Sequence, residues 1–201
     1  PQVADYRYWR GLAYAEKDDP DRALEDINEA IRLDPENDSY RYSRGRGYAE
    51  KGDFDQAIEN YNEAIRLDPE DADYRRWRGI AYAEKGDFDQ AIENYNEAIR
   101  LDPEDADYRY WRGLAYAGKD DFDQAIEDYD EAIRLDPQVA DYRYWRGLAY
   151  AEKDDPDRAL EDINEAIRLD PENDSYRYSR GRGYAEKGDF DQAIENYNEA
   201  I

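Results

Sequence analysis

The chain has 201 residues, a formal net charge of -25, and no His, Cys or Met. This composition excludes disulfides, thiolate or imidazole zinc sites, thiol nucleophiles and triads that need a histidine base. The negative charge repels nucleic acids and anionic membranes, so we expect protein or peptide partners and no nucleic acid. The 21 tyrosines favour a folded chain, because aromatic rings gain from burial.

Internal repetition dominates the sequence. The motif "EAIRLDP" recurs every 34 residues, and residues 1–65 are identical to residues 137–201, which makes a period of four repeats, or 136 residues. Gene duplication, an engineered cassette and a periodic fibre sequence would each produce this pattern, and each implies a longer array of which the chain is a window. The predicted repeats are 1–34, 35–68, 69–102, 103–136, 137–170 and 171–201.

The first element of each repeat is predicted to be a helix. In the third repeat it covers residues 73–85 and closes at Gly86, because glycine readily adopts the left-handed conformation that ends a helix. Asp18, Asp120 and Asp154 stand at this position in three other repeats. Aspartate adopts that conformation less easily, so these turns should be weaker.

The second element is a helix with one apolar stripe, which runs from Phe54 to Ile65 in the second repeat. Asp53 precedes it as an N-cap, with Gln56 three residues later in the pattern of a capping box. Pro20 replaces Phe54 in the first repeat and falls on the first helical position, which tolerates proline.

The spacing of small and aromatic residues resembles the tetratricopeptide repeat family over the whole chain. In one repeat the matching residues are Gly79, Tyr82, Ala91, Tyr95, Ala98 and Pro103. The resemblance implies an all-α fold, a right-handed superhelical α-solenoid that forms one domain over residues 1–201. It also implies a concave groove lined by the first helices. The pattern departs from the family at Arg75 and its equivalents, where a bulky apolar residue is usual.

The groove positions carried over from the family are mainly tyrosine, aliphatic and acidic. Such a groove suits a basic or extended peptide, although packing between repeats explains the same residues. The leading hypothesis is a structural scaffold or filament that makes protein contacts and associates end to end, and the alternative is a peptide-binding adaptor of the co-chaperone kind. The candidates are Asp5, Tyr8, Leu12, Glu16, Tyr42, Arg46, Arg76, Ile80, Tyr110, Leu114, Tyr144 and Leu148.

Other sites are weaker. "DDPD" and "GDFD" lack the spacing of a calcium loop, so no metal and no cofactor is expected. A chain of near-identical repeats offers no unique catalytic pocket, so we expect no enzyme. Asn37 and Asn173 begin "NDS" glycosylation sequons, which would matter in an extracellular protein; the localisation is otherwise expected to be cytoplasmic. No apolar run is long enough to span a membrane.

Overall fold

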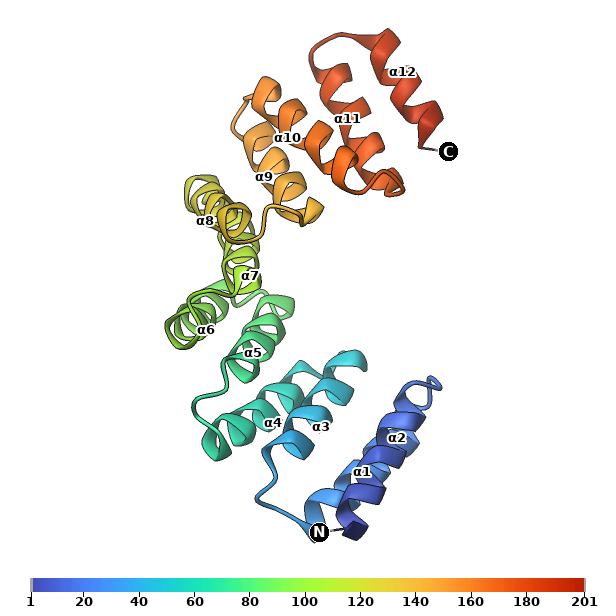
Figure 1. Cartoon of the computed structure of the whole chain (residues 1–201), viewed down its shortest axis with the longest axis vertical. Coiled ribbons are helices and arrows are strands. Elements are labelled where there is room, and N and C mark those ends of the chain that lie inside the picture. Colours follow the sequence, from blue (N-terminus) through green and yellow to red (C-terminus); the bar gives the residue numbers. More distant parts are fainter. Residues whose placement is uncertain (1, 201) are drawn as a thin grey trace. The chain divides into compact units, whose positions relative to one another are not determined.

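The computed structural model describes residues 2–200, and within them it contains twelve α-helices and no strand, which confirms the all-α prediction (Figure 1). The helices alternate between the first and second element of each repeat. They are α1 (Gln2–Ala15), α2 (Pro20–Leu33), α3 (Asp38–Glu50), α4 (Phe54–Leu67), α5 (Ala72–Glu84), α6 (Phe88–Leu101), α7 (Ala106–Ala117), α8 (Phe122–Leu135), α9 (Ala140–Glu152), α10 (Pro156–Leu169), α11 (Asp174–Glu186) and α12 (Phe190–Glu199).

The helices form two compact units, Pro1–Asp102 and Pro103–Ile201. Each unit contains three helix pairs, and the boundary between the units coincides with the predicted boundary between the third and fourth repeats. Within each unit, every pair packs on the next pair along the chain. A single right-handed superhelix over the whole chain stays a prediction.

Aspartate caps start the second helices as predicted. The side chain of Asp53 accepts a hydrogen bond from the backbone N–H of Gln56 at 3.2 Å, and Pro20 begins α2. The other half of the capping box is not formed, because the backbone N–H of Asp53 donates to the carbonyl of Tyr48 and the Gln56 amide donates to Glu59. One side-chain acceptor is therefore enough for this helix start.

The turn after the first helix has the predicted left-handed residue. Gly86 has a φ of 80°, and aspartates adopt the same conformation, with φ of 58° at Asp18 and 60° at Asp120. The helix before Gly86 ends at Glu84, one residue before the predicted end. These aspartates carry the steric cost of a Cβ atom in the left-handed region.

Glycine and tyrosine set the distance between the two helices of a repeat. A Cβ atom at Gly79 would lie 2.7 Å from Cε1 of Tyr95, which is fully buried. Gly113 faces Tyr129 in the same way in the fourth repeat. The helices can approach this closely only because the first helix has no side chain at this point.

Arginine at the position of Arg75 serves the turn between repeats. Arg75 is buried, and its Nη1 donates to the carbonyl of Asp71 at 3.1 Å; Arg109 Nη1 donates to the carbonyl of Pro103 at 2.6 Å. In the first repeat Arg7 instead pairs with Asp26 at 2.9 Å. A guanidinium thus satisfies backbone carbonyls or a buried carboxylate, which accounts for the departure from the family pattern.

Candidate functional site

Five of the twelve groove candidates line one pocket between the first and second repeats. The pocket has a volume of about 270 Å³ and is formed by α1, α2 and α3. That these residues bind a ligand stays a prediction. The pocket is lined by Tyr8, Leu12, Ala15, Glu16, Pro20, Ala23, Leu24, Ile27, Tyr42, Ser43, Arg46, Gly47 and Glu50.

The same pocket recurs between the fifth and sixth repeats, with a volume of about 260 Å³. Eleven of its twelve lining residues, the candidate Leu148 among them, lie 136 positions after residues of the first pocket. Asp154 is the exception, and the equivalents of Tyr8 and Tyr42 do not belong to its lining. The pocket therefore forms at both places where this pair of repeats occurs in the sequence. The second pocket is lined by Leu148, Ala151, Glu152, Asp154, Pro156, Ala159, Leu160, Ile163, Ser179, Arg182, Gly183 and Glu186.

The first pocket is open because a tryptophan is replaced by serine. Between the second and third repeats, the equivalent place holds Trp77, whose ring centroid lies 6.4 Å from that of Tyr42. Trp145 occupies this place between the fourth and fifth repeats. In the second repeat the residue is Ser43, and its Oγ lies 3.0 Å from Oη of Tyr8.

Two further aromatic residues are replaced in the wall opposite Ser43. Tyr61 of the second repeat is buried, and Phe54 packs in the same cluster, which also contains Trp77 of the third repeat. In the first repeat these positions are Ile27 and Pro20. Truncated side chains leave space where their atoms would have packed, so these replacements account for the hollow.

The pocket combines apolar walls with a charged rim. Glu16 lies at its edge, and within residues 2–200 its carboxylate makes no hydrogen bond or ion pair. Arg46 Nη2 lies 3.4 Å from Oε1 of Glu50, and its guanidinium carbon lies 4.5 Å from the centroid of the Trp77 ring. The rim therefore carries two acids and one base.

Tyr42 and Arg46 at the rim have pKa values above their ordinary values. Burial raises the pKa of Tyr42, against the opposing effect of Arg46. Burial alone would lower the pKa of Arg46, but the hydrogen bond to Tyr42 and the charge of Glu50 raise it. Arg46 therefore remains charged and Tyr42 remains neutral near pH 7.

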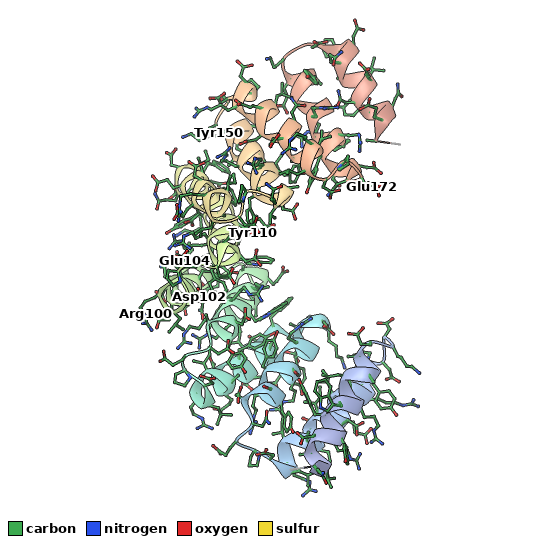
Figure 2. All side chains as sticks on the ribbon, viewed as in Figure 1. Arg100, Asp102, Glu104, Tyr110, Tyr150 and Glu172 are labelled. Carbon is green, nitrogen blue, oxygen red and sulfur yellow. The ribbon has the colours of Figure 1, made fainter. Side chains whose placement is uncertain are left out.

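Three other candidates are used for contacts between repeats. Asp5 accepts a hydrogen bond from the Tyr40 hydroxyl at 2.5 Å. Tyr144 stacks on Tyr176 with ring centroids 4.8 Å apart, and its Oη lies 3.1 Å from Oγ of Ser179. Tyr110, labelled on α7 in Figure 2, packs within the cluster around Trp145. These side chains favour the packing interpretation.

The last three candidates lie outside both pockets. Leu114 packs in the same cluster as Tyr110. Arg76 Nη2 pairs with Asp73 at 2.8 Å and its guanidinium lies over Trp77, while Ile80 is half-buried. The structure therefore does not join the first-helix positions into one uniform site.

Sequence reasoning missed the residues that create the pocket. Pro20, Ile27, Ser43 and Gly47 were visible as departures from the other repeats, but no single departure indicates a cavity. The combination of the four could have indicated the cavity. Each of them replaces a larger residue, and all four belong to the same pair of neighbouring repeats.

The remaining predicted features have structural roles. Oδ1 of Asn37 accepts a hydrogen bond from the N–H of Tyr40, and Oδ1 of Asn173 accepts one from the N–H of Ser175; glycosylation at either stays a prediction.

Across residues 2–200, no group of three or more acidic side chains is arranged to hold a metal ion. No helix in this range has the length and apolarity to cross a bilayer.

Family models described as "Tetratricopeptide repeat" match most of the chain. One model matches residues 42–103, 80–140, 112–174 and 144–201, and a second matches residues 4–37. Curated proteins gave no match.

Solved structures share the architecture. A crystal structure of MamA is 31% identical, with a TM-score of 0.69 over 78% of this chain and 91% of its own. A tetratricopeptide repeat protein from Parabacteroides merdae is 20% identical, with a TM-score of 0.84 over 99% of this chain and 79% of its own. YrrB, described as a TPR protein with an unusual peptide-binding site, is 23% identical, with a TM-score of 0.69 over 87% of this chain and 90% of its own.

Proposed function

Because the chain belongs to the tetratricopeptide repeat family, we propose that it is a non-enzymatic scaffold for protein–protein contacts that binds an extended peptide at the pocket beside Ser43. Its copy beside Ser179 would bind a second peptide. One observation carries the proposal: this interface is hollow where the equivalent interfaces contain tryptophan. The description of YrrB as a peptide-binding repeat protein supports the same type of function.

The size and chemistry of the pocket favour a peptide over a small molecule or a substrate. Pockets for drug-sized ligands range from about 300 to 1,000 Å³, and a volume of about 270 Å³ suits one large side chain of a longer ligand. The apolar walls offer burial, and the polar rim offers partners for a peptide backbone. The chain contains no histidine or cysteine that could act as base or nucleophile.

A peptide library screened against two forms of the chain tests the proposal. The first form is the chain itself, and the second carries Ser43→Trp and Ser179→Trp, which restore the residue found in the third, fourth and fifth repeats. Peptides enriched on the chain should bind the filled variant at least about tenfold more weakly. Peptides that bind both forms equally would show that the pockets are not the binding site.

End-to-end association is a second candidate, and one observation favours it. Val3, Tyr6 and Trp9 of α1 are 62%, 66% and 65% exposed, whereas the identical residues 136 positions later pack against the preceding repeat or its neighbours. A second copy could cover this face, because exposed aromatic patches favour association. Sedimentation velocity and electron microscopy should show assemblies that grow with concentration and that Tyr6→Glu with Trp9→Glu abolishes. Discrete monomers at every concentration would contradict it.

A further inference from the structure

The chain itself contains examples of the side chain that the pocket lacks. At two equivalent interfaces the space is filled by Trp77 and Trp145, each next to the tyrosine of the preceding repeat. In each case three successive helices at equivalent positions surround this place. An indole is therefore a group that this architecture already accepts at this place, and the pocket beside Ser43 is the version in which the chain does not supply it.

A hydroxyl that could accept a hydrogen bond from an indole lies at the wall of the pocket. At the interface between the second and third repeats, by contrast, Nε1 of Trp77 is buried without a hydrogen-bond partner within residues 2–200. The hydroxyl at the pocket belongs to Tyr8, and its oxygen lies 3.0 Å from Ser43 Oγ. A ligand indole N–H could donate to this tyrosine oxygen, which satisfies the one polar atom that an indole buries.

The charged residues at the rim indicate which charge a bound peptide should carry next to its aromatic side chain. Arg46 pairs with Glu50, while the carboxylate of Glu16 has no partner in the described part of the chain. In the second pocket Arg182 pairs with Glu186, and Glu152 is likewise without a partner across residues 2–200. A cation of the ligand would complete an ion pair at each rim, and the net charge of -25 favours a basic ligand at longer range.

We propose that each pocket binds an aromatic side chain, best a tryptophan, of a partner peptide that carries lysine or arginine next to it. This inference rests on the proposed function, that the pockets bind a peptide. A second copy of the chain is a less suitable source, although Trp9 is exposed. Arg7 and Arg10, the arginines nearest to Trp9 in the sequence, already pair with Asp26, so they offer no free cation to the rim.

Fluorescence polarisation of labelled peptides with the full chain tests the inference. The probe is Gly-Ser-Lys-Trp-Lys-Ser-Gly, and its analogues carry alanine or leucine in place of tryptophan, or glutamate in place of both lysines. We expect the alanine analogue to bind at least about tenfold more weakly, and the leucine and glutamate analogues about three- to tenfold more weakly. The glutamate penalty should shrink as salt is raised. Two peptides should bind per chain.

Two pairs of variants locate the interaction. Ser43→Trp with Ser179→Trp should weaken binding of the tryptophan peptide at least about tenfold. The matched control, Glu25→Trp with Glu161→Trp, adds tryptophan at exposed positions of α2 and α10 outside both pockets and should bind within about threefold of the original chain. Glu16→Gln with Glu152→Gln should weaken the lysine peptide about two- to fivefold and leave a serine-flanked peptide unchanged.

The outcomes separate the inference from the function on which it rests. If leucine or glutamate peptides bind as tightly as the probe and the filled variant loses them, the peptide pocket stands and the aromatic and basic preference is wrong. If the filled variant binds every peptide as the original chain does, both are wrong. If Trp9→Ala abolishes a dimer that competes with the probe, the occupant is a second copy and the inference is overturned.

Discussion

Oη of Tyr8 lies 3.0 Å from Oγ of Ser43, and Oη of Tyr144 lies 3.1 Å from Oγ of Ser179. One repeat later, Trp77 stands at the position of Ser43, and Tyr42 of the preceding repeat lies beside its indole instead of a hydroxyl. A small hydroxyl satisfies the tyrosine without filling the space. This pair of residues therefore marks two interfaces that remain open, one in each unit.

Filling one pocket should stabilise the chain. Ser43→Trp places an indole between the first and second repeats, as in the neighbouring interface, and should raise the free energy of unfolding by about 1 to 2 kcal/mol. Urea unfolding followed by circular dichroism measures the change. Glu25→Trp, at an exposed position of α2, is the control and should change stability by less than about 0.5 kcal/mol. A destabilised Ser43→Trp chain would show that the pocket does not accept an indole.

Two glycine substitutions should have opposite effects. Both Gly47 and Gly79 lie within first helices, so alanine brings the same gain in helix propensity, about 0.5 to 1 kcal/mol. At position 47 the new Cβ would lie 3.1 Å from the end of the flexible Leu24 side chain, which borders the pocket and can move. At position 79 it would lie 2.7 Å from the fully buried Tyr95 ring.

We therefore expect Gly47→Ala to stabilise the chain by about 0.5 kcal/mol and Gly79→Ala to destabilise it by about 1 to 3 kcal/mol, as overpacked cores do. Thermal and urea unfolding of the two variants under identical conditions provide the comparison. Equal effects at the two positions would contradict the close helix contact at Gly79.

Exchanging glycine and aspartate at the left-handed position of the turns should change the stability of the chain in opposite directions. Asp154 has a φ of 58°, where glycine has no steric cost, so Asp154→Gly should stabilise the chain by about 0.5 to 1 kcal/mol. Gly86→Asp should have the opposite effect, because Gly86 has a φ of 80°. Asp154→Asn removes the charge alone and controls for the acidity of the chain. If Asn and Gly stabilise equally, charge and not backbone conformation is responsible.

Stability should fall at alkaline pH. Burial raises the pKa of Tyr61, Tyr95 and Tyr129 above the ordinary value of 10.0. The folded chain therefore keeps these protons where the unfolded chain loses them, so the stabilisation is complete below pH 10 and is lost as the pH rises further. Each such tyrosine contributes a slope of about 1.4 kcal/mol per pH unit.

Urea unfolding at several values from pH 8 to pH 11.5, with tyrosinate absorbance as a second readout, measures this slope. Tyr129→Phe lacks one ionisable group and should reduce the slope by about 1.4 kcal/mol per pH unit. If the tyrosines ionise gradually near pH 10 while the helical signal is unchanged, the buried tyrosines are not protected in the way described.

Local structure followed from the sequence because its causes are local. An aspartate cap such as Asp53, a left-handed residue such as Gly86 and an apolar stripe each act within one or two helical turns. They determine where helices start and end, and a repeat of 34 residues multiplies the same solution along the chain. The all-α fold and the tetratricopeptide repeat family could be predicted from these features.

The candidate site was decided by contacts between helices that are distant in sequence. Asp5 looked free to face a ligand, but the Tyr40 hydroxyl, 35 residues later, occupies it. Pro20, Ile27 and Ser43 are unremarkable substitutions one by one, and only the packing of α1, α2 and α3 brings their missing volume to one point. The sequence by itself determined the repeat, its helices and its charge. The tertiary structure alone decided which interface is hollow, because a cavity depends on the sum of volumes that meet across three helices and not on the spacing along one.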